Sequence, residues 1–263
     1  MLKDIKALLL DVQGTLTTRD EHGRNILVGG VRLIEHARRT GRRILVLTNA
    51  TKRNEAILND LRGAGLPLED GEILSAGQAT GLYLREKRGA CRLWILGERS
   101  LGEELAKYGH EIVNDTSEKP HFVVVGLDRE LTFEKLNTAL AHLRSGAELI
   151  GCHASKRIPE KDREIISVGP IVKALEYASD KQAIIIGKPS RVMYEMALAK
   201  LRVNPHEALM ISDELKNDLL PAKDIGMKTA LTLTGVTKRQ DLERSEIKPD
   251  IVVENIDDLV SFL

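Results

Sequence analysis

The first regular pattern in the chain is a run of four apolar residues, 7–10, that ends at Asp11. An apolar run without alternation is typical of a short strand buried on both faces of a parallel sheet. Gly14 and Thr15 follow, and a glycine there lets the chain turn tightly enough to present backbone N–H groups to an anion. The pattern predicts a central strand with Asp11 at its carboxyl end, where open α/β sheets bind their ligands.

Similar runs alternate with amphipathic segments after a polar loop over residues 17–25. The spacing of apolar residues predicts helices and strands in turn, and glycines mark several helix ends. This βαβαβ order implies right-handed crossovers and a parallel sheet. The expected elements are helices over 31–39, 54–62 and 78–86, and strands over 44–47 and 72–76.

The organisation changes at about residue 89. We interpret residues 89–180 as an inserted second domain, and residues 1–88 and 181–263 as the first domain. The insert is expected to hold strands over 93–96, 121–127 and 148–152 and helices over 101–108, 133–144 and 170–177. The first sheet is expected to resume with strands over 183–186, 208–211 and 229–233, a helix carrying Asp218, and a last strand and helix over 251–263. The fold class is therefore α/β, a parallel-sheet core with an α/β insert.

Composition narrows the class of protein. A chain of 263 residues is near the upper size for one core, which agrees with a domain that carries a smaller insert. Lys plus Arg and Asp plus Glu number 39 each, so no net field attracts nucleic acid or an anionic membrane. Cys91 and Cys152 supply neither a disulfide framework nor a four-ligand zinc motif, and we expect free thiols.

No apolar run approaches the roughly twenty residues of a membrane span. Met1 leads almost directly into the first predicted strand. We therefore expect a soluble, cytoplasmic protein that binds neither nucleic acid nor membrane.

Four predicted strands end in residues suited to phosphoryl chemistry: Asp11, Thr48 with Asn49, Lys188, and Asp213. The carboxyl ends of parallel strands meet at one edge of a sheet, so these side chains are expected to converge. Two carboxylates and a backbone carbonyl suit Mg²⁺, which keeps water and substrate phosphate in its octahedral shell. The lysine would offset charge on the transferring group, and Thr48 and Asn49 would hold its other oxygens.

Each candidate also has a purely structural interpretation. Asp11 can cap the strand-to-turn transition, Asp213 can cap the following helix, and Lys188 can be a solvated surface lysine. Asp218 can support the metal site from outside the ligand shell, or it can simply interact with the dipole of its helix. His153 lies beside Cys152, but two adjacent residues cannot make a metal site, and a satisfied loop histidine is the better interpretation.

In order and spacing, these residues resemble the motifs of the haloacid dehalogenase-like (HAD) superfamily, in the subgroup whose α/β (type IIA) cap lies between motifs two and three. Residues 167–178 and 186–190 also look like the phospholysine phosphohistidine inorganic pyrophosphate phosphatases and their relatives. The resemblance assigns residues 11–15 to motif one, Thr48 and Asn49 to motif two, Lys188 to motif three, and Ser212, Asp213 and Asp218 to motif four.

The resemblance implies a Rossmann-like core, a cap domain and an aspartyl phosphate on Asp11. It implies Mg²⁺ held by Asp11, the Gln13 backbone carbonyl and Asp213, with Asp218 also at the metal site. It implies phosphate contacts from Gln13, Gly14, Thr48, Asn49 and Lys188. It also implies a homodimer formed through the cap, and the aliphatic runs at 93–96 and 123–125 are in keeping with such an interface.

One departure matters, because most phosphatases of the superfamily carry an aspartate as general acid and base where this chain has Gln13. A smaller one is Ser212, where motif four usually opens with glycine. We expect a Mg²⁺-dependent phosphatase for a small phosphorylated compound with a low-pKa leaving group, such as an aryl phosphate, acyl phosphate, phosphoramidate or pyrophosphate. The alternative is a catalytically weak module that binds a phosphometabolite.

Overall fold

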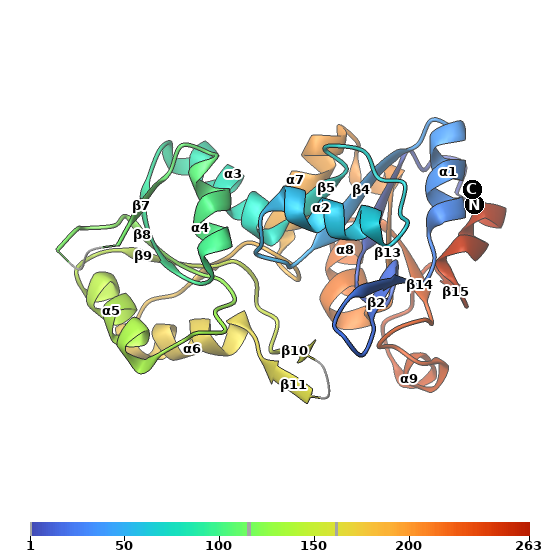
Figure 1. Cartoon of the computed structure of the whole chain (residues 1–263). Coiled ribbons are helices and arrows are strands. Elements are labelled where there is room, and N and C mark those ends of the chain that lie inside the picture. The colour runs from blue at the N-terminus through green and yellow to red at the C-terminus, as the bar shows by residue number, and fades with distance from the viewer. Residues whose placement is uncertain (1, 115–116, 161–162) are drawn as a thin grey trace. The chain divides into compact units, whose positions relative to one another are not determined.

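The computed structural model describes residues 2–114, 117–160 and 163–263 (Figure 1). The chain forms two compact units. The first comprises residues 1–48, 57–74 and 194–263, and the second comprises residues 49–56 and 75–193.

The first unit contains a six-stranded sheet with the order β15-β14-β13-β1-β4-β5. The pairs that join β15, β14, β13, β1 and β4 are all parallel. Every residue of β1 and β13 is buried, as expected of central strands with both faces covered. The strands are β1 (Ala7–Asp11), β4 (Arg43–Thr48), β5 (Ile73–Ser75), β13 (Ala208–Ser212), β14 (Lys228–Thr232) and β15 (Ile251–Val253).

Two helices associated with this sheet, α1 and α2, each bury one apolar stripe. In α1, Leu33, Ile34 and Ala37 are buried, which is the i, i+1, i+4 spacing of a single helix face. This helix packs against the C-terminal helix η3, close to both chain ends (Figure 1). The helices are α1 (Val31–Arg39), α2 (Asn54–Gly63), α7 (Arg191–Leu201), α8 (Leu220–Asp224), α9 (Arg239–Arg244), the 3₁₀ helices η1 (Pro205–Glu207) and η3 (Ile256–Phe262), and the π-helix η2 (Leu215–Leu219).

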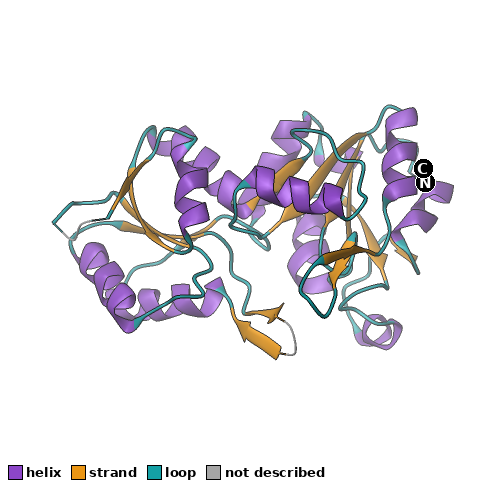
Figure 2. Cartoon of the chain, viewed as in Figure 1, coloured by secondary structure: helices purple, strands orange, loops and turns teal. Residues whose placement is uncertain are grey.

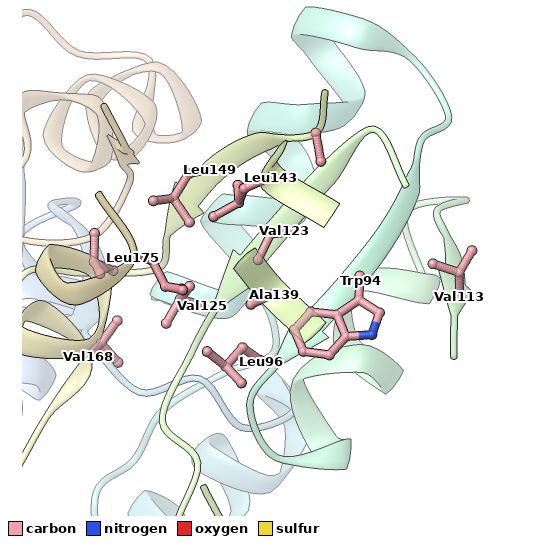
Figure 3. Close-up of a cluster of buried hydrophobic side chains, with 12 residues drawn as sticks. Trp94, Leu96, Val113, Val123, Val125, Ala139, Leu143, Leu149, Val168 and Leu175 are labelled. Carbon is pink, nitrogen blue, oxygen red and sulfur yellow. The ribbon is translucent and has the colours of Figure 1, made fainter. Parts of the chain in front are cut away.

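The second unit has its own parallel sheet, with the order β12-β9-β8-β6-β7. Side chains such as Trp94, Val123 and Leu149 pack with those of α5 and α6 into one apolar core (Figure 3). The strands are β6 (Arg92–Leu96), β7 (Glu111–Val113), β8 (Phe122–Val125), β9 (Glu148–Gly151) and β12 (Ile184–Ile185), and the helices are α3 (Ala76–Arg88), α4 (Arg99–Ala106), α5 (Phe133–Arg144) and α6 (Val168–Ser179).

The prediction that residues 183–186 resume the first sheet is wrong. Strand β12 pairs in parallel with β9, with Ile184 opposite Ile150. Helix α6 packs against β9 and β8 immediately before β12, so the chain returns to the same sheet after one helical crossover. Only three of the four strands that carry the candidate site residues therefore share the six-stranded sheet.

Two short hairpins were not predicted: β2 (Thr17–Arg19) with β3 (Asn25–Leu27), and β10 (Arg157–Glu160) with β11 (Arg163–Ile166) (Figure 2). The expected polar loop over residues 17–25 is wrong, because its two ends pair. The Asp20 carboxylate accepts hydrogen bonds from the backbone N–H groups of His22 and Arg24 and so fixes the turn. Three-residue strands are too short to show a clear alternation.

No helix within the described residues has the length and apolar character needed to cross a membrane. Cys91 and Cys152 are both free and buried, which confirms the expectation of free thiols. Burial raises the pKa of the Cys152 thiol to about 12, so this sulfur is protonated and unreactive near neutral pH.

Candidate active site

Three predicted site residues lie at the carboxyl edge of the six-stranded sheet. Asp11 ends β1 and Thr48 ends β4, and the register places Asp11 opposite Leu47, one residue before Thr48. Asp213 follows β13, whose Ile211 pairs with Leu10. The first unit therefore brings Asp11, Thr48 and Asp213 to one edge of the sheet, as the sequence predicts.

The Asp213 carboxylate is held from several sides. Its Oδ1 accepts a hydrogen bond from Thr15 Oγ1 at 3.3 Å, and its Oδ2 accepts one from the backbone N–H of Val236 at 2.6 Å. A Cβ added at Gly14 or Gly235 would lie 2.2 Å or 1.9 Å from Oδ2, so neither position has room for a side chain. The sequence analysis placed Thr15 in motif one but did not predict its contact with Asp213, and it missed Gly235 and Val236, although a glycine just after a predicted strand was a usable signal.

Asp218 lies on η2 and is buried. Its Oδ2 accepts a hydrogen bond from Ser212 Oγ at 2.7 Å, and the same hydroxyl accepts one from the backbone N–H of Glu214 at 3.1 Å. The serine that replaces the usual motif-four glycine thus ties Asp218 to the residue before Asp213. Asp218 therefore has a specific contact in addition to any interaction with the helix dipole.

The same edge of the sheet carries a concentration of negative charge. Burial raises the pKa of the Tyr194 phenol well above its usual value, and nearby carboxylates raise it further. These carboxylates are Asp218, Asp11 and Glu214. These carboxylates therefore lie close enough to one buried phenol to make its ionisation unfavourable.

Asp11 and Asp213 supply carboxylate oxygens, the kind of ligand that hard divalent cations prefer. Within the described residues, no three His, Cys, Asp or Glu side chains are grouped to hold a metal ion. Asp11 and Asp213, with the Gln13 backbone carbonyl, would leave the other positions to water and substrate oxygens. Mg²⁺ is typically bound by one or two carboxylates in this way, with substrate phosphate completing its shell.

Gln13 is exposed and is linked to the β2–β3 hairpin. Its Nε2 donates a hydrogen bond to Asn25 Oδ1 at 3.1 Å, and the N–H of Gly14 donates to the Thr17 carbonyl at 2.8 Å. Gln13 and Thr17 also form an isolated β-bridge. Asn25 is a neighbour of the site that sequence reasoning did not find, because its contact depends on the unpredicted hairpin.

Asn49 and Lys188 belong to the second unit. Asn49 Nδ2 donates to the Lys188 carbonyl oxygen at 2.9 Å and to Ser155 Oγ at 3.2 Å. Lys188 is only 4% exposed, so the interpretation as a solvated surface lysine is wrong. A buried lysine in a folded protein is held by partners and is suited to binding an anion.

His153 is buried beside these residues. Its Nδ1 accepts a hydrogen bond from the backbone N–H of Ser155 at 3.2 Å, which confirms the interpretation as a satisfied loop histidine. Burial, and then the charge of Lys188, lower the pKa of His153 to about 4. The ring is therefore neutral at pH 7, with its proton on Nε2.

The neutral His153 ring should make the protein sensitive to mild acid. Its pKa is about 4 when folded and about 6.5 when unfolded, so the unfolded chain binds the extra proton first as the pH falls. We expect this residue to contribute a loss of about 2 kcal/mol in the free energy of unfolding between pH 7 and pH 5. Urea unfolding at both pH values measures the free energy of unfolding of wild type and of His153→Asn. The variant is the control, since the asparagine oxygen can replace Nδ1 as acceptor but does not titrate. Equal losses for both proteins would contradict the prediction.

Comparison with known proteins agrees with this fold. Residues 8–111 match the family model for haloacid dehalogenase-like hydrolases, and residues 185–259 match a HAD-hydrolase-like family. The chain is 30% identical over 254 residues to the sugar-phosphatase AraL of Bacillus subtilis, with 96% of this chain and 91% of the relative covered. It is 31% identical over 300 aligned positions to human glycerol-3-phosphate phosphatase, with 100% and 92% covered.

Two solved structures share the whole fold. The 4-nitrophenylphosphatase of Thermotoga maritima superposes with a TM-score of 0.90 at 30% identity, covering 99% of this chain and 98% of that one. The p-nitrophenyl phosphatase of Archaeoglobus fulgidus gives a TM-score of 0.88 at 30% identity, covering 99% and 100%.

The α/β fold, the ordered motifs and these relatives show that the chain belongs to the haloacid dehalogenase-like hydrolases, in the subgroup with a type IIA cap. Within that family it is a phosphatase that hydrolyses phosphoric monoesters.

Proposed function

We propose that the protein is a Mg²⁺-dependent phosphatase that forms an aspartyl phosphate on Asp11. The observation that carries this proposal is that Asp11 and the enclosed Asp213 carboxylate follow neighbouring parallel strands to the same edge of the sheet. Asp11, the Gln13 backbone carbonyl and Asp213 would hold the ion, with Asp218 supporting them through Ser212. Bound Mg²⁺ would offset the negative charge of the phosphate and orient it.

In the first half-reaction, a carboxylate oxygen of Asp11 attacks phosphorus and the bond to the leaving oxygen breaks. In the second, water attacks the aspartyl phosphate, releasing orthophosphate and restoring the carboxylate. The Thr48 hydroxyl is proposed to bind a phosphoryl oxygen, and Lys188 to offset the charge of the phosphoryl group as a point cation. The expected contact from the Gly14 backbone N–H is not part of the proposal, because that N–H donates to the Thr17 carbonyl.

The substrate is proposed to be a small phosphorylated compound with a low-pKa leaving group. A glutamine at position 13 cannot protonate a departing alkoxide, whereas an aryl oxide or acyl oxygen leaves without a proton. The names of the relatives include 4-nitrophenylphosphatase, which fits this preference, and sugar and glycerol-3-phosphate phosphatases, which act on alkyl esters. A comparison of aryl and alkyl phosphates on this protein tests the proposal.

Removal of the metal should inactivate the enzyme. We expect EDTA to abolish hydrolysis of p-nitrophenyl phosphate and added Mg²⁺ to restore it, because two adjacent carboxylates cannot otherwise accept a phosphate dianion. Ca²⁺ should inhibit, since its larger and less regular oxygen shell misplaces the nucleophile. Steady-state rates after dialysis and metal addition measure both effects. Undiminished turnover in EDTA, confirmed metal-free by elemental analysis, would refute the metal requirement.

We also propose that residues 89–180 serve as the cap and form a homodimer. The aliphatic residues of β6 and β8 do not support this interface, because nearly all are buried within their own unit. Two large apolar side chains give better support: Phe133 is 78% exposed and Tyr177 is 90% exposed.

Charged residues at these two positions should disrupt such a dimer. We expect the wild-type chain to sediment as a dimer at micromolar concentration and Phe133→Glu/Tyr177→Glu to sediment as a monomer, because a buried unpaired carboxylate is costly. Analytical ultracentrifugation of the full chain distinguishes the two states. As a control, Phe262→Glu changes an exposed aromatic residue outside the insert and should leave the dimer intact. A monomeric wild type would contradict the proposal.

A further inference from the structure

Ser155 is held at three points within the second unit. Its backbone N–H donates to His153 Nδ1 at 3.2 Å, and its carbonyl oxygen accepts from the N–H of Gly169 at 3.0 Å. Its hydroxyl oxygen accepts from Asn49 Nδ2 at 3.2 Å. A Cβ added at Gly169 would lie 2.9 Å from the Ser155 carbonyl oxygen, so this segment is closely packed. The position of the hydroxyl is therefore well defined.

Acceptor chemistry fixes the orientation of the Asn49 amide. The Lys188 carbonyl oxygen can only accept, so it must face Nδ2 of Asn49 and not Oδ1. The second hydrogen of Nδ2 points to Ser155 Oγ, which therefore acts as an acceptor. Both amide hydrogens are thus used inside the unit, and none is left for a phosphate oxygen. Oδ1 is buried, and a Cβ added at Gly187 would lie 2.7 Å from it.

The hydroxyl proton of Ser155 is not used by these contacts. A hydroxyl that accepts from an amide still has its own proton to donate, and the part of the chain that the structure describes offers that proton no acceptor. A positive charge lies near this segment, since Lys188 is close enough to lower the pKa of His153, two residues before Ser155. A donor beside a buried cation is best matched by an anionic acceptor.

We propose that Ser155 contacts the substrate, donating its hydroxyl proton to an oxygen of the phosphoryl group, and that Asn49 positions this hydroxyl instead of binding phosphate. The ligand class is a tetrahedral oxyanion, either orthophosphate or a phosphate monoester. The inference rests on the proposed function, in which Lys188 binds the same phosphoryl group.

Orthophosphate binding to the full chain in the presence of Mg²⁺, followed by isothermal titration calorimetry, tests the inference without depending on turnover. Ser155→Ala should weaken binding by about 10- to 100-fold, the loss typical of one hydrogen bond to a charged group. Ser155→Thr should restore it, because the hydroxyl is kept. Ser179→Ala is the matched control, since the Ser179 hydroxyl donates to the Leu175 carbonyl within α6. Thermal unfolding of each variant confirms the fold.

The role of Asn49 is tested by a double-mutant cycle. If Asn49 only positions Ser155, Asn49→Ala should weaken orthophosphate binding about as much as Ser155→Ala, and the double variant should be no weaker than either. Additive losses would show that Asn49 itself contacts phosphate and would overturn that part of the proposal. Wild-type affinity in a folded Ser155→Ala variant would overturn the whole proposal.

Lys188→Met separates this inference from the proposed function. Loss of orthophosphate binding in Lys188→Met with normal binding in Ser155→Ala would reject only the role of Ser155. Normal binding in Lys188→Met would instead reject the proposed role of the lysine, and the Ser155 variants would still decide whether the hydroxyl contacts the anion.

Discussion

Asp11→Asn is expected to abolish turnover while leaving the fold intact. An amide is neither a competent nucleophile nor an anionic ligand for Mg²⁺, so both functions proposed for this position are lost together. Removing a nucleophile from a site that acts as a unit costs at least about 10⁴-fold in kcat. The near-identical size of aspartate and asparagine keeps the buried end of β1 packed. Hydrolysis of p-nitrophenyl phosphate measures the loss.

Asp4→Asn is a matched control, because Asp4 is an exposed aspartate close in sequence and should tolerate the same change. A second readout is covalent: wild type quenched in acid during turnover should carry one acid-stable, base-labile phosphoryl group, and Asp11→Asn should carry none. Turnover near that of wild type in Asp11→Asn, or a phosphoryl group on another residue, would end the phosphoenzyme hypothesis.

Gln13→Asp is expected to raise kcat by about 10²- to 10⁴-fold, the usual contribution of a general acid or base. Water attacks the aspartyl phosphate in every turnover, and glutamine can hydrogen-bond this water but cannot take its proton. Wild type should therefore show a burst of leaving group matching the enzyme concentration, followed by slow steady-state turnover. The variant should lose the burst and gain activity on alkyl phosphates, whose leaving oxygen needs a proton.

The structure accommodates this change. Gln13 is exposed, so the shorter aspartate side chain has room there and loses only the hydrogen bond from Nε2 to Asn25 Oδ1. Gln13→Asn is the matched control: it has nearly the shape of aspartate but no exchangeable proton, so it should stay slow. Equal wild-type rates on glycerol phosphate and p-nitrophenyl phosphate, or no faster dephosphorylation in a folded Gln13→Asp variant, would show that another group transfers the proton.

Much of the fold could be predicted from the sequence because its central strands are continuous apolar runs. Strands β1, β4 and β13 lie within a residue or two of their expected positions, since burial on both faces demands such runs. The sheet to which β12 belongs could not be predicted in this way. A short apolar run specifies a buried strand but not its neighbour, and here the packing of α6 on β9 decided it.

The candidate site could be predicted in part. Asp11 and Asp213 were found because Asp11 directly follows an apolar run, Asp213 follows another after Ser212, and parallel strands put their carboxyl ends together. The groups that hold Asp213 were missed, because Thr15 and Val236 are far apart in sequence and the second acts through its backbone N–H. A backbone N–H is present in every residue except proline, so the residue type does not reveal which one donates. The hydrogen bond from Asn49 to the Lys188 carbonyl oxygen could not be predicted for the same reason, because it also depends on a backbone group.

The register of the central strand also bears on how the chain is made. On one side of β1, Ala7 pairs with Arg43 of β4, which is translated soon after it. On the other side, Ala7 pairs with Ala208 of β13, which is translated only after the entire second unit. During synthesis, an apolar strand edge with unpaired backbone groups is therefore exposed while residues 49–193 emerge, and exposed edges of this kind promote association between chains. The order of translation, and not the stability of the finished fold, sets the period in which a nascent chain most needs a chaperone.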